Sequence, residues 1–176
     1  MTTTPDSTAI FLWVKKAFPC LIMLTALTAL SLIPLDFGIL RDVRPMFLLT
    51  GIYYWALFRP RFLSPFGVFM IGLIYDILAG LPFGLTSLVL IGVYMLVHRQ
   101  RKLLFSQPFW ILWMVYIILT TAAGAITWLL LSLLRFHIMP PMPQILEIFL
   151  SAATFPLIVL ILKLANPPFK VHLDKK

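Results

Sequence analysis

One carboxylate inside a long apolar run is the residue of this chain that is best placed to do chemistry. Asp76 is the only charged residue between Phe66 and Val97. An aspartate at the centre of a membrane helix costs roughly 2.5 to 3.5 kcal/mol on insertion scales, so such a group usually faces protein or water and marks a candidate functional site. We therefore expect Asp76 to have a partner inside the protein.

Three glycines and a proline accompany this carboxylate. If the run is helical, Gly72, Asp76 and Gly80 share one small and polar face, because they are spaced by four residues. Gly80 stands where a helix ends, and Pro82 stands where a following helix has its first turn, with Gly84 two residues later. The pattern predicts a tight helical hairpin whose second helix turns the positive end of its dipole toward the aspartate.

Two interpretations of the hairpin stay open. Asp76 either fixes helix packing as a buried polar residue or takes a direct part in binding or transport. Glu147 stands near the start of a later apolar run, where a carboxylate favours the helix dipole, so capping is favoured over catalysis. The histidines His98, His137 and His172 are far apart, and no nucleophile with a base and no phosphate-binding glycine loop is present. We expect no enzyme activity, no metal and no cofactor.

The composition is typical of an integral membrane protein. Of the 176 residues, 61% are hydrophobic and 11% are charged, against about 25% charged residues in soluble domains. The mean hydropathy is +1.02. The net charge of +8 comes from Lys and Arg between apolar runs, which is typical of topology signals and of contact with anionic lipid at the cytoplasmic face rather than of nucleic-acid binding. Cys20 is the only cysteine, so an intrachain disulfide is excluded.

Six apolar runs predict an all-α membrane domain over residues 17–165. The expected helices cover residues 17–35, 45–58, 65–79, 82–97, 109–134 and 144–165. A cytoplasmic tail, residues 1–16, precedes this domain, and a basic cytoplasmic tail, residues 166–176, follows it. An uncleaved first helix is favoured over a signal peptide, because further apolar runs follow it.

The second run, residues 45–58, is short for a bilayer core of about 30 Å. It either crosses with local thinning of the membrane or is partly re-entrant. Tyr53, Tyr54 and Trp55 near its end suit an aromatic belt at the membrane interface.

The distribution of Lys and Arg predicts that the C-terminus and the basic segment 98–102 lie in the cytoplasm. With six spans and a cytoplasmic N-terminus, 11 of the 14 Lys and Arg residues lie inside and 3 outside. Five spans with an outer N-terminus give the same count, because Arg41 and Arg44 then exchange sides with the two lysines before the first run. Charge alone does not decide whether the second run crosses.

The chain resembles the MreD family of bacterial rod shape-determining membrane proteins. The residues that carry the resemblance are Arg44-Pro45, Tyr54-Trp55-Ala56-Leu57 with Arg59-Pro60, and Gly72-Leu73-Ile74-Tyr75-Asp76-Ile77-Leu78 followed by Gly80-Leu81-Pro82-Phe83-Gly84. The similarity covers most of the chain in length and helix order, and residues 44–85 are its distinctive part.

This resemblance implies a six-helix protein of the bacterial inner membrane, with a fold similar to the substrate-binding subunits of energy-coupling-factor transporters. It implies a non-catalytic part in cell elongation, with MreC, MreB and the peptidoglycan synthases RodA and penicillin-binding protein 2 as partners. The hairpin would shape a pocket or a partner surface near the periplasm. The outer cations that would pair with Asp76 or Glu147 are Arg41, Arg44 and Arg135. The alternative is a small-molecule or lipid-binding transporter subunit with Asp76 in its ligand site.

Overall fold

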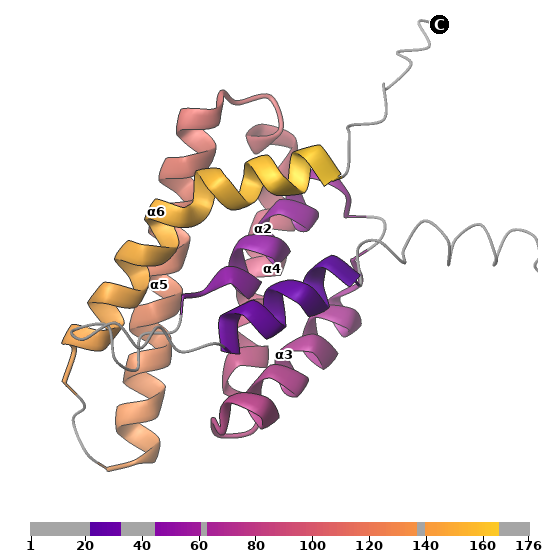
Figure 1. The fold of residues 1–176 in the computed structure, drawn as a ribbon. Helices are drawn as coiled ribbons and strands as arrows, with labels where there is room; N and C mark the ends of the chain where they lie inside the picture. The colour runs from indigo at the N-terminus through magenta and orange to yellow at the C-terminus, as the bar shows by residue number, and fades with distance from the viewer. Residues whose placement is uncertain (1–21, 33–44, 61–62, 137–139, 166–176) are drawn as a thin grey trace, which may run out of the picture.

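The described part of the chain is built from helices. The computed structural model describes residues 22–32, 45–60, 63–136 and 140–165, and these residues contain no strand. The helices are Ile22–Leu32, α2 (Phe47–Phe58), α3 (Pro65–Ala79), α4 (Leu85–Leu104), α5 (Phe109–Leu134) and α6 (Met142–Ala165). The connection from α4 to α5 and the end of α6 lie at one end of the bundle, and the α3–α4 turn lies at the other (Figure 1). The predicted tails, 1–16 and 166–176, lie outside the described residues.

Helix α2 is the centre of the bundle. It packs against α4, α5 and α6, and every residue from Leu48 to Leu57 is buried. Gly51 allows the helix Ile22–Leu32 to cross closely, since a Cβ added at Gly51 would lie 2.6 Å from Cδ1 of Leu27. A helix that is apolar on all sides is stable in such a place, because each side meets another helix rather than water.

The aromatic residues of α2 belong to this core, so the prediction of an interfacial belt is wrong. Trp55 is 0% exposed and Tyr53 is 1% exposed. The rings of Tyr116 and Phe155 stack with centroids 4.1 Å apart, and Tyr53 meets both rings edge-on. Aromatic pairs in these geometries add to the stability that burial alone provides. The short run is held inside the bundle by neighbouring helices.

Helix α4 differs from its expected bounds, 82–97, at both ends. Pro82 precedes the helix, and its carbonyl oxygen accepts a hydrogen bond from the N–H of Leu85 at 3.2 Å. The basic segment 98–102 is helical rather than a loop. Its cations are favourable in the last turns, where the helix dipole is negative, and Nε of Arg101 donates to the carbonyl oxygen of Leu57 at 2.8 Å.

The other helix boundaries follow local signals. Helix α3 begins at Pro65, after Ser64 whose hydroxyl oxygen accepts from the N–H of Phe66 at 3.3 Å. Helix α3 and helix α5 have the bounds expected from the sequence, whereas α2 begins two residues later than expected. Helix α6 begins at Met142 instead of residue 144. Pro143 therefore lies in its first turn, where a missing N–H is tolerated.

Two helices are long and apolar enough to cross a membrane, namely α5 and the segment Met142–Leu164 of α6. The helices Ile22–Leu32, α2 and α3 are apolar but shorter. Large apolar side chains also cover outer faces of the bundle: Phe66, Phe149 and Leu164 are 70%, 72% and 74% exposed. Apolar surface of this kind is typical of contact with lipid or with another protein.

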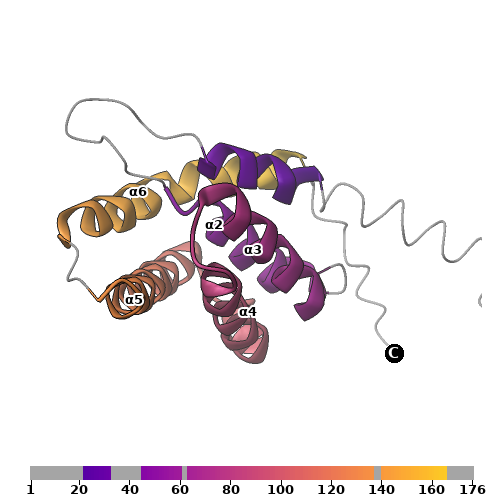
Figure 2. The ribbon, with the colours of Figure 1, turned by 90° about the horizontal axis from the view of Figure 1, so that it is seen from below.

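The helices form two groups, which Figure 2 shows from below. Helices α3 and α4 pack against each other on one side, and α5 and α6 pack against each other on the other side. Helix α4 also contacts α5. Gly124 brings α5 and α6 close together, since a Cβ added there would lie 2.9 Å from Cδ1 of Ile148.

Candidate functional site

The carboxylate of Asp76 is fully buried and binds the N-terminus of α4. Its Oδ2 accepts hydrogen bonds from the N–H groups of Gly84 at 3.1 Å and Ser87 at 3.4 Å, and its Oδ1 accepts from the N–H of Thr86 at 3.0 Å. The hydroxyl of Ser87 donates to Oδ2 at 3.3 Å. The negative charge therefore lies against the positive end of the α4 dipole, where an anion is stabilised.

These bonds satisfy the first N–H groups of α4, whose N-cap residue has no side chain. Gly84 holds the N-cap position with φ 86°. The N–H of Leu85 donates to the carbonyl oxygen of Pro82, and the next two N–H groups donate to Asp76. A helix usually meets this need with a Ser, Thr, Asp or Asn side chain at its own N-cap. Here the preceding helix provides the carboxylate.

The main chain of the same residue ends α3. The carbonyl oxygen of Asp76 accepts from the N–H of Leu81 at 3.0 Å, and the N–H of Gly80 donates to the carbonyl oxygen of Ile77 at 3.4 Å. Gly80 has φ 67°. This pair of bonds with a left-handed glycine is a Schellman motif, which closes the end of a helix. Asp76 thus closes one helix with its backbone and opens the next with its side chain.

Gly72 allows α3 and α4 to come close enough for these bonds. A Cβ added at Gly72 would lie 2.6 Å from Cα of Ser87 and 3.0 Å from its Oγ. Because the first of these atoms belongs to the backbone, the two helices would have to separate to accept a side chain. The glycine and the aspartate, one turn apart on α3, meet the same serine of α4.

Among the described residues, the side chain of Asp76 has its hydrogen-bond partners at the N-terminus of α4, and none of these partners is an arginine. Arg135 lies at the end of α5, and Arg41 and Arg44 lie outside the described residues. The prediction that Glu147 caps its helix is wrong, because α6 starts earlier than expected and its first turn holds no acidic residue. Nε2 of Gln144 donates instead to Oε2 of Glu147 at 3.2 Å.

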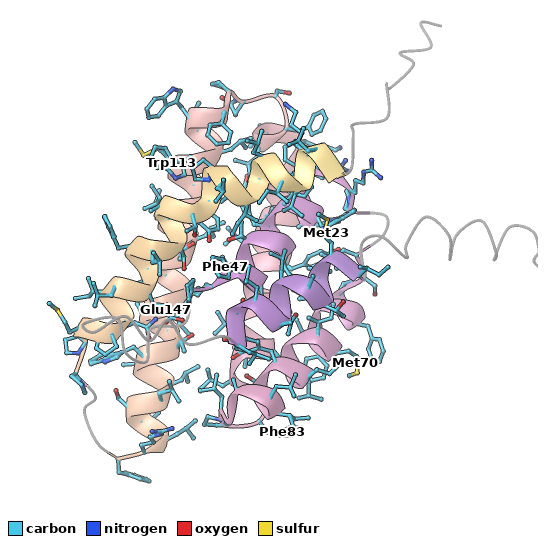
Figure 3. The ribbon with its side chains drawn as sticks, in the orientation of Figure 1. Met23, Phe47, Met70, Phe83, Trp113 and Glu147 are labelled. Carbon is cyan, nitrogen blue, oxygen red and sulfur yellow. The ribbon has the colours of Figure 1, made fainter. Side chains whose placement is uncertain are left out.

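A cavity of about 540 Å³ lies beside the hairpin, between the two groups of helices. Ligand pockets in proteins are typically about 300 to 1,000 Å³. Its apolar wall comes from α2 and α4, and consists mainly of Leu48, Leu49, Val89 and Leu90. Its polar wall comes from α5 and α6, and includes Thr127, Arg135, Gln144 and Glu147. Figure 3 labels Glu147 on α6 and Phe83 at the tip of the hairpin.

The cavity brings together some of the predicted site residues and leaves others out. Gly80, Arg135 and Glu147 line it. Asp76 is not among the lining residues, although its neighbour Tyr75 and its partner Thr86 are. Asp76 therefore holds the wall of the cavity in place rather than facing its interior.

Two polar residues of this region were missed by the sequence analysis. Ser87 lies in the first turn of α4, where both its N–H and its hydroxyl donate to Asp76. Gln144 stands three residues before Glu147, a spacing that places both on one helix face. Within the described residues, no group of three or more His, Cys, Asp and Glu side chains is placed to hold a metal ion.

The chain was also compared with known proteins. A family model described as rod shape-determining protein MreD matches residues 11–165. No curated protein and no solved structure matches the chain. The matched region contains all the described helices, and it includes both the hairpin and the residues around the cavity.

Proposed function

The chain belongs to the MreD family of rod shape-determining proteins, and we propose that it is a non-catalytic membrane subunit of the bacterial cell-elongation machinery. In this role it binds MreC and helps to assemble or regulate peptidoglycan synthesis. MreB and the synthases RodA and penicillin-binding protein 2 are then reached directly or through MreC. The family match over residues 11–165 carries the proposal, since its description names shape determination and no chemical reaction.

The proposed location is the inner membrane, with six spans and both termini in the cytoplasm. Two long apolar helices support a membrane location. Basic residues stand at the C-terminal ends of three helices: Arg59 follows α2, Arg99, Arg101 and Lys102 lie in the last turns of α4, and Lys163 lies in the last turn of α6. An excess of Lys and Arg is typical of the cytoplasmic side, where it also favours contact with anionic lipid.

The exposed apolar face of α3 is a candidate surface for a single-span partner. Phe66, Ile74, Ile77 and Leu78 are all more than half exposed on this helix. Membrane helices associate through close packing and hydrogen bonds, since lipid is as apolar as their side chains. The hairpin presents this face rigidly, because Asp76 and Gly72 fix α3 against α4.

A second candidate function is a small-molecule or lipid-binding transporter subunit, with a fold similar to that of energy-coupling-factor substrate-binding subunits. The observation that favours it is the cavity of about 540 Å³ with one apolar and one polar wall. A scaffold that acts only through its outer faces has no need of such a cavity.

Affinity purification tests the two functions against each other. The tagged protein is isolated from bacterial membranes in mild detergent, and mass spectrometry identifies the proteins and small molecules that elute with it. We expect MreC and elongation synthases in stoichiometric amounts. Recovery of a transport ATPase in their place would contradict the elongation role and favour the transporter subunit.

A further inference from the structure

The cavity beside the hairpin combines an apolar interior with groups of opposite charge. It is lined from every described helix, from Ser31 on the first to Glu147 on the last. A ligand in this place would touch both groups of helices at once. The chemistry of the lining therefore indicates the class of ligand.

The apolar wall favours a hydrocarbon chain. Leu48, Leu49, Val89 and Leu90 carry no polar side-chain group, and together they face the space between the helices. Small residues, Ala79 and Ala123, widen it. Contact with such a wall is favourable for an alkyl chain and unfavourable for a charged metabolite that would leave its hydration shell.

Among the described residues, the polar wall carries one cation and one anion. Arg135 at the end of α5 is exposed, and its guanidinium can hold a phosphate through two parallel hydrogen bonds. Glu147 is half-buried, and Gln144 orients it by donating to one of its oxygens. A carboxylate accepts several donors, so a primary ammonium group with three N–H bonds matches it well.

We propose that this cavity binds one lipid whose head group carries both a phosphate and a primary ammonium, as in phosphatidylethanolamine. The phosphate lies on Arg135 and the ammonium lies on Glu147, while an acyl chain enters the apolar part beside α2 and α4. This site is separate from the outer faces of the bundle, which contact lipid without selecting a head group. The proposal does not depend on assembly with MreC.

Lipid binding to the purified full-length protein tests the proposal. Native mass spectrometry in detergent is recorded with added phosphatidylethanolamine, phosphatidylcholine or phosphatidylglycerol. We expect one tightly retained phosphatidylethanolamine, with an apparent affinity at least about tenfold higher than for the choline lipid, which has no N–H to donate to Glu147. The glycerol lipid, which has no ammonium group, binds more weakly for the same reason.

Variants separate the head-group contacts from the cavity itself. Glu147→Gln removes the preference for ethanolamine over choline, and Arg135→Gln weakens binding of the ethanolamine and glycerol lipids alike. Thr127→Leu narrows the cavity without changing a charge and lowers retention of every lipid. Lys163→Gln, in the last turn of α6 and away from the cavity lining, is the matched control and leaves the preference for ethanolamine over choline unchanged.

Two results would overturn the proposal. The first is equal retention of the three lipids by the wild-type protein and by Glu147→Gln, which would mean that lipid binds only to the outer faces. The second is that the wild-type protein retains a water-soluble polar molecule in preference to the lipids and that Thr127→Leu does not retain it, which would assign the cavity to a soluble ligand. A single sharp elution peak for each variant shows that it is folded.

Discussion

At the scale of single residues, Asp76 and the N-terminus of α4 stabilise each other as a pair. A buried carboxylate without donors is unfavourable, and so are three backbone N–H groups without an acceptor. The structure joins them through hydrogen bonds of 3.0 to 3.4 Å. Removing the carboxylate therefore leaves the buried N–H of Ser87 and the half-buried N–H groups of Gly84 and Thr86 without their acceptor, and this cost exceeds the loss of one ordinary hydrogen bond.

We expect Asp76→Ala to lower the free energy of unfolding by about 2 to 4 kcal/mol, because it removes a charged helix cap that accepts four hydrogen bonds. Asp76→Asn keeps the shape of the side chain and one acceptor oxygen, so its loss is smaller. Thermal unfolding of the purified protein in detergent measures both effects. A melting temperature for Asp76→Ala equal to that of the wild type would show that the cap contributes nothing.

Gly72 provides a second test, because its role is purely one of space. We expect Gly72→Ala to destabilise the protein by about 1 to 3 kcal/mol, since its new methyl group would overlap the backbone of Ser87. Gly92 on α4 is the matched control, because an added Cβ there meets nothing within 4 Å. Gly92→Ala is expected to be neutral or slightly stabilising, because alanine is the better helix former. Denaturant unfolding in detergent compares the two variants, and equal effects would contradict the close contact.

At the scale of helices, several breaks in the backbone pattern are repaired by side chains from other helices. The N–H of Leu48, in the first turn of α2, donates to Oγ of Ser31 at 3.1 Å, and the N–H of Met46 donates to Oγ of Ser151 at 2.8 Å. Asp76 does the same for α4. Away from water, an unpaired backbone group costs several kcal/mol. These contacts make the helix ends inside the bundle possible.

The proline inside α6 is another such break. Pro156 has no N–H, so the carbonyl oxygen of Ala152 lacks its usual partner four residues later. Nε1 of Trp113 on α5 donates to this oxygen at 3.0 Å. The tryptophan therefore both repairs α6 and fixes it against α5.

A double-mutant cycle tests this interpretation. We expect Trp113→Phe to cost about 1 to 2 kcal/mol in the wild-type background, because it leaves a backbone carbonyl without a donor. In the Pro156→Ala background the cost should be clearly smaller, since residue 156 then has an N–H that can bond to Ala152. Unfolding free energies of the four proteins give the coupling. Additive effects would mean that the proline and the tryptophan are independent.

At the scale of the whole molecule, helix boundaries that depend on neighbouring residues were predicted correctly, whereas those that depend on contacts between helices were not. Ser64, Pro65 and Gly80 set the bounds of α3 by capping and by the left-handed turn, and all three are visible in a short stretch of sequence. The start of α4 was misplaced because a contact with the preceding helix, through Asp76, determines it. The family resemblance is confirmed over residues 11–165.

The cavity could not be predicted from the sequence, because its walls come from several helices. The sequence placed the start of α6 two residues too late, so Glu147 was expected to cap this helix. In the structure it lines the cavity. The burial of Trp55 was missed for a related reason: a short aromatic run is ambiguous until the helices around it are known. Both features depend on how separate helices meet, and periodicity within one helix carries no information about this.

Helix α2 is short for a helix that crosses a membrane. Its 12 residues rise about 18 Å, less than a bilayer core of about 30 Å. Its start is satisfied by Ser31 and Ser151, and Arg101 donates to the carbonyl oxygen of Leu57 near its end. Both ends can therefore lie inside the bundle rather than in water. Such partners satisfy the ends of a crossing helix and of a re-entrant helix alike, so they are compatible with six spans and with five.

Cysteine labelling tests this arrangement, with Cys20 replaced by serine so that each variant has one thiol. We expect a membrane-impermeant maleimide to label Phe83→Cys in intact cells, because the hairpin tip is exposed at the end opposite the basic residues. Ser106→Cys, between α4 and α5, should react only after the cells are permeabilised. Thr3→Cys decides the number of spans, since six spans protect it in intact cells and five expose it. Labelling of Thr3→Cys from outside would therefore mean that α2 does not cross, despite the partners at its ends.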